Sequence, residues 1–262
     1  MKPGETLHTF VVLAYKESPY LERCIQSVLQ QHTPTTVLIA TATPNAHIEQ
    51  LANRYELPVL INNEGGNIGK DWNFGLHCGN TPLVTLAHQD DQYLSDYASS
   101  CIKAYHKRSA SKPLILFNPT IVKVNGKKPL ISYKNIVRWV LLFPFHFNRC
   151  IQSTFWRTFA VRFGNSISCP GVCYCMENLK GFRFDESMKF TLDWDAWHRL
   201  SLQQGSFVYI PQALHIHLEH SDSTTNTIGT ETLIAEEKAL LTRIWNSKRA
   251  AEFITKLLRV TK

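Results

Sequence analysis

The chain has 262 residues, 44% of them hydrophobic, which excludes a disordered protein and is enough for one large core or one and a half ordinary domains. No stretch has the roughly 18 uncharged apolar residues of a membrane span, and the first ten residues lack the apolar core of a signal peptide, so we expect a cytoplasmic protein. The net charge of +7 favours an anionic ligand or membrane face, whereas no basic run with interleaved aromatic residues predicts nucleic-acid binding.

The first half of the chain alternates between strand and helix patterns. Apolar and β-branched runs predict four strands, at residues 8–14, 36–40, 58–61 and 83–87. Apolar residues at helical spacing predict four intervening or following helices, over residues 18–29, 45–55, 71–78 and 94–105. This order predicts an α/β fold with a mainly parallel, Rossmann-like sheet and helices on both faces. The helical stripes place Leu29 and Leu94 in the core.

A polar loop follows each predicted strand. These loops are Tyr15-Lys16-Glu17, residues 41–45, residues 62–70 and residues 88–92. Because the carboxyl ends of parallel strands meet at one edge, we expect the loops to line one ligand crevice. The Gly-rich loop over 65–71 has neither the glycine spacing nor the hydroxyl residue of a Walker phosphate loop, and an ordinary turn explains its glycines equally well.

Asp90 and Asp91 come directly after the fourth predicted strand. Two neighbouring carboxylates in a partly buried crevice repel each other unless a cation or hydrogen-bond donors compensate. Hard oxygen ligands suit Mg²⁺ or Mn²⁺, which take further ligands from water and from substrate phosphates. A solvated turn that caps the following helix is the structural alternative.

Four stretches together are more specific than the acidic pair. In chain order they read VVLAYKESPYLERCIQSVLQQ, NIGKDWNFGL, LVTLAHQDDQYL and FDESMKFTLDWDAWHRL. In order and spacing they resemble the inverting family 2 glycosyltransferases of bacterial type, which have the GT-A fold. The resemblance implies that Asp90 lies near the ribose of a sugar nucleotide, that Asp91 binds a divalent ion, and that Asp193 is the catalytic base. The glutamate that precedes this base in the family is replaced by Leu192.

The same resemblance implies a larger set of site residues. His217, with His220 as second choice, is expected near the diphosphate and the metal, although either could be an ordinary loop residue. A family aspartate that binds the base is replaced near Thr43, so the nucleotide is open, with UDP as the default. The first acid of the longer acidic motif is replaced by His88. We expect the following residues to bind the donor: Tyr15, Lys16, Glu17, Thr43, Asn67, Lys70, Asn73 and Asp90.

The helix that follows Asp193 also has a structural interpretation. Asp193 could cap it while Trp194, Trp197 and Leu200 pack inward, and Asp195 is expected to be exposed and to support the helix start. Asp193 could serve both as cap and as base.

The middle of the chain is rich in aromatic residues and arginines. Strand patterns are expected at 114–117 and 121–124, followed by two helices interrupted at Pro144. Residues 135–163 could pack on the sheet as a helical hairpin, which we favour, or lie on a membrane to meet a lipid-linked acceptor. Amphipathic helices are predicted over 233–245 and 248–262, and the second, basic helix could contact lipid head groups.

These observations predict a metal-dependent inverting glycosyltransferase that moves a sugar from a nucleotide diphosphate to a saccharide or lipid-linked acceptor in cell-surface polysaccharide synthesis. It is expected to be cytoplasmic, with a peripheral contact on the inner membrane face. A nucleotide-sugar-binding part (1–110), an acceptor-side part (111–225) and C-terminal helices (226–262) are expected. A sugar nucleotidyltransferase and a non-catalytic sugar-binding module are the alternatives.

Overall fold

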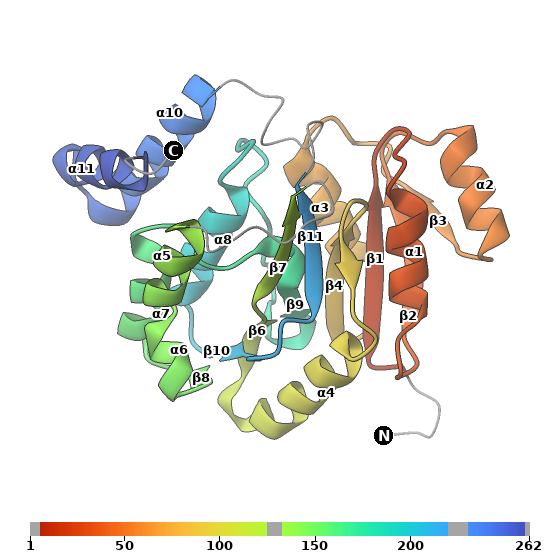
Figure 1. Ribbon diagram of the computed structural model, residues 1–262, viewed down its shortest axis with the longest axis horizontal. Coiled ribbons are helices and arrows are strands. Elements are labelled where there is room, and N and C mark those ends of the chain that lie inside the picture. The colour runs from red at the N-terminus through yellow and green to blue at the C-terminus, as the bar shows by residue number, and fades with distance from the viewer. Residues whose placement is uncertain (1–5, 125–132, 220–229, 260–262) are drawn as a thin grey trace.

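The computed structural model describes residues 6–124, 133–219 and 230–259. An eight-stranded sheet in the order β3-β2-β1-β4-β9-β6-β10-β8 forms its centre (Figure 1). Its strands are β1 (His8–Ala14), β2 (Thr36–Thr41), β3 (Val59–Ile61), β4 (Leu83–His88), β6 (Pro113–Phe117), β8 (Cys150–Ile151), β9 (Val172–Cys175) and β10 (Ser206–Tyr209). All are parallel to β1 except β8 and β9. The predicted mainly parallel sheet is confirmed.

The helices of the first half cover both faces of this sheet. They are α1 (Leu21–Leu29), α2 (Ala46–Arg54), α3 (Ile68–Cys78) and α4 (Tyr97–Arg108). α1, α2 and α4 share one apolar cluster with β1, whereas α3 packs in the cluster on the opposite face. Two predicted core positions are wrong. Leu29 is exposed because it ends α1, and Leu94 is exposed because it precedes α4.

One central strand comes from far along the chain. β9 lies between β4 and β6 and is antiparallel to both. A second, three-stranded sheet contains β5 (Gln92–Tyr93), β11 (His215–Glu219) and β7 (Thr120–Val124). The strand predicted at 121–124 therefore exists but belongs to this smaller sheet, which joins the acidic turn after β4 to the end of the second half.

Helices of the second half gather at one end of the molecule, on the left in Figure 1. We call α5, α6, α7, α10 and α11 the helical end. Pro144 does not interrupt a helix, because it lies in the first turn of α6, where a missing N–H costs nothing. Among the described residues, no helix combines the length and apolarity needed to cross a bilayer. The bounds are α5 (Tyr133–Leu141), α6 (Phe143–Phe147), α7 (Thr154–Arg162), α8 (Leu192–Ser201), α10 (Thr230–Trp245) and α11 (Lys248–Arg259), with short 3₁₀ turns at Ser109–Ser111, Cys169–Gly171 and Met176–Asn178.

Candidate active site

The polar loops after β1 to β4 converge on one cavity of about 980 Å³. Six of the predicted donor-binding residues line it, namely Tyr15, Lys16, Glu17, Thr43, Asn67 and Asp90. The lining also includes Asn62, Asp71 and Lys189, which the sequence did not single out. Lys70 and Asn73 are not among the described residues that line the cavity.

Hydrogen bonds between the loops fix the cavity rim. The backbone N–H of Lys16, a residue in the left-handed region with φ of 54°, donates to Thr43 Oγ1 at 2.6 Å. Gln89 accepts from the Tyr15 N–H at 2.8 Å and donates to the Tyr15 carbonyl at 3.1 Å. These hydrogen bonds, at Tyr15 and at the Lys16 N–H, hold the Lys16 backbone in its strained conformation, as is common at ligand sites.

Asn67 and Asn73 have different structural roles. Asn67 caps α3 by accepting from the Lys70 N–H at 2.9 Å, which leaves the helix start beside the cavity. Asn73 is buried, and its amide accepts from the Phe184 N–H at 2.7 Å and donates to Glu186 at 2.9 Å. Its amide therefore holds the segment that leads to α8. These contacts point the Asn73 amide at the protein and give no support for a contact with the nucleotide-sugar donor.

A cluster of potential metal ligands forms where β4 ends. One ligand atom each from His88, Asp90 and Asp91 lies within 4.8 Å of the others. The Nε2 of His88 and the Oδ2 of Asp91 have no access to solvent and no hydrogen-bond partner among the described residues. Buried polar atoms without partners are costly, so a cation between them fits this donor set.

His217 is held against Asp91 by the smaller sheet. β11 pairs with β5 in a register that aligns Ile216 with Gln92, and the His217 Nδ1 lies 2.7 Å from Asp91 Oδ1. Burial raises the pKa of Asp91, and the contact with His217 opposes this rise. Burial also lowers the pKa of His88, which favours the neutral imidazole that binds metals. His220 lies outside the described residues.

Asp193 lies in the first turn of α8 and is not its N-cap, a position taken by Thr191. Its carboxylate accepts from the Asn165 amide at 2.7 Å and from the Trp194 N–H at 2.7 Å. Burial raises its pKa to about 6 against these bonds. A carboxylate with this pKa is ionised at neutral pH but still basic enough to accept a proton.

Several groups lie near both Asp193 and the acidic cluster. Burial raises the pKa of the Cys169 thiol, and the charges of Asp193 and Asp91 raise it further. Burial lowers the pKa of His215 to about 3, and the positive charge of Arg138 on α5 lowers it further, while the same charge partly opposes the burial-driven rise in the pKa of Asp193. The two halves of the predicted site therefore share one electrostatic environment.

The helical end supports the start of α8. Glu236 of α10 accepts from the backbone N–H groups of residues 189 to 191 at 2.7 to 3.0 Å, and these bonds lower its pKa despite burial. The expectation that Asp195 is exposed is wrong. It is fully buried because Arg199, at 2.7 Å, and Arg243 of α10 both pair with its carboxylate.

The profile of glycosyl transferase family 2 matches residues 9–152, more than half of the chain. The chain belongs to this family. It is therefore a glycosyltransferase, as predicted, which sets aside the nucleotidyltransferase and the non-catalytic module. A search of curated proteins gave no match.

Solved glycosyltransferase structures share its GT-A fold. A crystal structure of S. aureus TarS 1–349 matches with a TM-score of 0.64 at 14% identity, covering 95% of this chain and 69% of TarS 1–349. Similar matches are to the same protein in complex with UDP-GlcNAc and with UDP. The mannosyltransferase PcManGT from Pyrobaculum calidifontis, in complex with GDP-Man and Mn²⁺, matches with a TM-score of 0.61 at 12% identity, covering 93% of this chain and 64% of PcManGT.

Further residues join the site without a sequence assignment. The sequence pattern presents His88 only as a replaced acid, although a histidine two positions before Asp90 is itself a ligand signal. Gln89, between His88 and Asp90, lies in a predicted loop and carries no signal of its own. Glu236 carried no signal, because only the packing of α10 brings it to the start of α8.

Proposed function

We propose that this glycosyltransferase is metal-dependent and inverting, that it uses a nucleotide-diphosphate sugar, with UDP as the default, and that it glycosylates a saccharide or lipid-linked acceptor at the cytoplasmic face of the membrane in cell-surface polysaccharide synthesis. The observation that carries the metal dependence is the pair of buried, unpartnered atoms at His88 Nε2 and Asp91 Oδ2 beside Asp90. Their position at the end of β4, next to the cavity, is where a diphosphate would leave.

The cavity residues would bind the donor. Tyr15, Lys16, Glu17 and Thr43 form the rim that would enclose the nucleotide, and Asp90 would accept hydrogen bonds from its ribose. His88 and Asp91 would hold Mg²⁺ or Mn²⁺, with His217 orienting the Asp91 carboxylate. A divalent cation, when bound there, supplies positive charge opposite the departing diphosphate.

Asp193 would be the base for a single displacement. The acceptor oxygen forms a bond to the anomeric carbon as the bond from that carbon to the diphosphate oxygen breaks, and the acceptor proton passes to Asp193. Inversion needs this one base and no carboxylate nucleophile, in contrast to retaining glycosidases. A raised pKa of about 6 suits the role.

The ligands of the solved relatives support the donor class. TarS binds UDP-GlcNAc and UDP, and PcManGT binds GDP-Man together with Mn²⁺. The nucleobase differs between these proteins, uracil in TarS and guanine in PcManGT. The nucleotide that this chain uses therefore has to be found with a panel of sugar donors.

A thermal-shift panel tests the proposal. One nucleotide sugar should raise the melting temperature, because a ligand at 100 times its Kd adds about 2.7 kcal/mol to stability. If the metal holds the diphosphate, this shift should appear only when Mn²⁺ or Mg²⁺ is present. Asp91→Asn should abolish this shift. Asp96→Asn is the matched control, because Asp96 is an exposed aspartate that contacts His32 instead of the cluster. Equal shifts with and without metal, or an unaffected Asp91→Asn variant, would contradict the metal assignment.

A further inference from the structure

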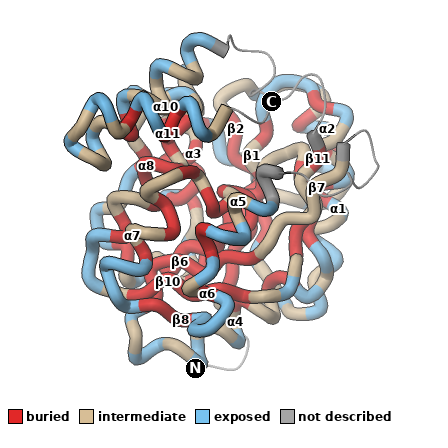
Figure 2. The backbone as a smooth tube through the Cα atoms, turned by 60° about the vertical axis from the view of Figure 1, so that its left-hand side comes forward, coloured by how far each residue is buried: buried red, intermediate tan, exposed pale blue. Residues whose placement is uncertain are grey.

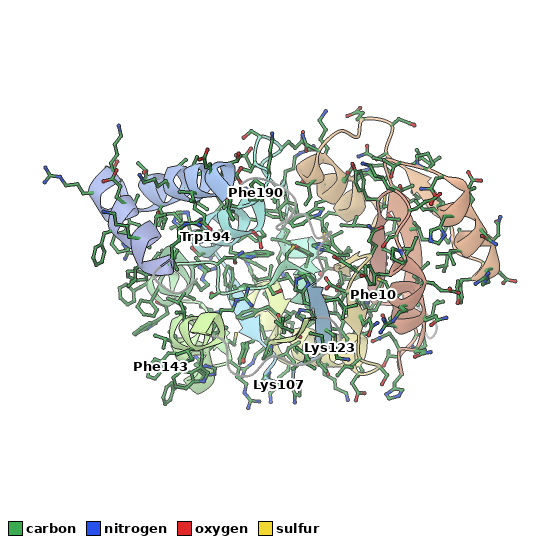
Figure 3. All side chains as sticks on the ribbon, turned by 45° about the horizontal axis from the view of Figure 1, so that its top comes forward. Phe10, Lys107, Lys123, Phe143, Phe190 and Trp194 are labelled. Atoms are coloured by element: carbon green, nitrogen blue, oxygen red, sulfur yellow. The ribbon has the colours of Figure 1, made fainter. Side chains whose placement is uncertain are left out.

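One face of α5 exposes an apolar stripe. Ile136, Trp139 and Val140 follow one another at helical spacing on α5, and Phe143, the first residue of α6, continues the stripe; all four are exposed, with Trp139 at 59%. The opposite side of the helix is the one that packs, since Leu141 is buried. Figure 3 shows Phe143 at the outer edge of the molecule. The favoured expectation of a hairpin packed on the sheet thus accounts for only the inner side of this helix.

Aromatic residues of α6 and α7 extend the stripe. Phe147 is 79% exposed and its ring lies 4.8 Å from that of Phe143. Phe155 and Trp156 of α7 are 63% and 45% exposed, and their rings lie 5.0 Å apart. α5, α6 and α7 contact one another. An aromatic surface of this extent is unusual for a protein that meets only water.

α11 adds a face of mixed character beside these helices. Arg249, Phe253, Lys256 and Leu257 are exposed and share one side of the helix, whereas Ile254 is buried. Basic and large apolar residues on the same exposed side are typical of helices that lie in a membrane interface.

α11 is a neighbour of α5 and α7. A methyl group built on Gly164, just after α7, would lie 3.4 Å from Leu258 of α11 and 3.5 Å from Leu141 of α5. Figure 1 shows α5, α7 and α11 at the same end of the molecule, and Figure 2, in which this end is turned forward, shows exposed segments on these helices. We call the combined surface the basic-aromatic face, defined by Trp139, Phe143, Phe147, Phe155, Trp156, Arg249, Phe253 and Lys256.

Charge decides between the possible occupants of this face. Exposed basic residues of these segments include Arg149, Arg249 and Lys256, whereas Arg157 is buried, and residues 133–163 contain no acidic residue. A second copy of the chain would bring the same positive charge to the contact and would be repelled. Anionic lipid head groups would attract it, with each basic residue near the surface strengthening binding about fivefold, while aromatic side chains enter the head-group boundary.

We propose that the basic-aromatic face docks the protein on the surface of an anionic lipid bilayer. The aromatic side chains of α5 to α7 and Phe253 would enter the interface, and Arg249 and Lys256 would contact lipid phosphates. Docking is independent of the proposed reaction.

Docking would also place the reaction near the bilayer. α7 contacts both α5 and α8, and Asn165, just after α7, donates to Asp193 at 2.7 Å, so the proposed base lies close behind the docked helices. This second statement rests on the proposed function and favours the lipid-linked acceptor over a free saccharide.

Vesicle co-sedimentation tests the docking. The full chain should sediment with phosphatidylcholine vesicles that contain phosphatidylglycerol, and much less with phosphatidylcholine alone. Combining Trp139→Ala, Phe143→Ala and Phe147→Ala should weaken binding by at least about 100-fold, because large apolar side chains leave the interface. Combining Arg249→Gln and Lys256→Gln should weaken it roughly 30-fold.

Two matched controls keep these variants interpretable. Leu29→Ala with Leu60→Ala removes exposed apolar side chains of the first half, and Lys103→Gln with Lys107→Gln removes exposed charges from α4. Both controls should bind vesicles like the unmodified chain. Melting temperatures and nucleotide-dependent shifts of all variants separate lost docking from lost folding.

Tryptophan fluorescence adds a measurement of orientation. Trp139 and Trp156 are exposed, Trp245 is half-buried, and Trp72, Trp194 and Trp197 are buried. Brominated lipids should therefore quench the unmodified chain, and Trp139→Phe with Trp156→Phe should lose most of the quenching while still sedimenting.

Three outcomes would overturn the proposal. They are no sedimentation with anionic vesicles, sedimentation that the basic-aromatic variants do not weaken, and concentration-dependent self-association that these variants abolish in the absence of vesicle binding. Failure of sugar transfer with intact sedimentation would instead contradict only the proposed function.

Discussion

The cavity and the helical end depart from ordinary burial in opposite directions. At the cavity a carboxylate, Asp91, is fully buried, and the nearby Nε2 of His88 has no partner among the described residues. On the helical end, large aromatic side chains such as Phe147 are exposed. Both arrangements are unfavourable in water alone. We interpret both as surfaces completed by something outside the chain: a cation and nucleotide at the cavity, and lipid at the helical end.

Removing the proposed base should give the largest effect. Asp193→Asn keeps the shape and the contact with Asn165 but cannot accept the acceptor proton, so turnover should fall by about 10³-fold, within the range for general bases. Metal-dependent nucleotide binding should stay intact, because Asp193 does not line the cavity among the described residues. Nucleotide release in a coupled assay measures turnover, and calorimetry measures binding.

Asp96→Asn serves again as the control, with unchanged turnover expected. Turnover in Asp193→Asn close to that of the unmodified chain would remove the base assignment. Loss of nucleotide binding would show instead that Asp193 belongs to the donor site.

Glu236 of α10 tests whether the helical end only adds stability or also positions the proposed base. Glu236→Ala removes the acceptor for three backbone N–H groups that precede Asp193. We expect a loss of about 2 kcal/mol in the free energy of unfolding, and about tenfold lower kcat with a smaller change in KM, because the base is misplaced. Denaturant unfolding and steady-state kinetics measure the two effects.

The neighbouring Glu237 provides the comparison for this variant. Its carboxylate pairs with Arg259 at 2.6 Å, and both side chains are largely buried, so Glu237→Ala should also cost about 2 kcal/mol in the free energy of unfolding but leave kcat unchanged. Equal kinetic effects in both variants would mean that α10 acts only through general stability.

The third prediction concerns pH. Burial raises the pKa of Asp193 to about 6, so the base is protonated, and inactive, below that pH. Between pH 6 and 5, kcat should fall about fivefold, approaching tenfold per pH unit at lower pH, the slope for a single group, and it should be nearly level above pH 7. A profile of kcat measured at saturating substrate tests this expectation. A profile that is flat down to pH 5 would contradict it.

The raised pKa of Asp193 also makes the free energy of unfolding depend on pH. The direction is opposite to that for a salt-bridged aspartate, whose pKa is lowered. The folded state binds the proton more tightly than the unfolded state, so the contribution of Asp193 is most favourable below about pH 4 and is lost as pH rises towards 6. The loss is at most about 3 kcal/mol, and we expect about 1 kcal/mol because Asp193 is partly exposed. Asp193→Asn should therefore be slightly more stable than the unmodified chain at pH 7.

The first half of the fold could be predicted because neighbours in sequence are neighbours in space. β1, β2, β3 and β4 fall within a residue of their predicted bounds and pair in parallel, as expected. Their polar loops then had to converge, which is why six of eight predicted donor residues line the cavity. The position of Asp90 and Asp91 followed from the same rule.

The second half depends on contacts that no local pattern encodes. β9 enters the sheet between strands that precede it in the chain, and the burial of Asp195 depends on Arg243, which reaches it from α10, as well as on Arg199. The apolar run over 135–163 could not reveal which side of each helix faces solvent. Asn73 was assigned to the donor from family resemblance, whereas its position against Phe184 depends on the folding of a distant loop.

The place of β9 has a consequence for protein synthesis. β4 and β6 have no partner on their facing edges until residue 175 has left the ribosome, since β9 joins them. Open strand edges recruit other chains, and nascent chains paused before this point would present two of them. Truncated products that end before residue 172 should therefore accumulate in inclusion bodies and engage chaperones. The chain avoids this aggregation only after β9 has been inserted between β4 and β6.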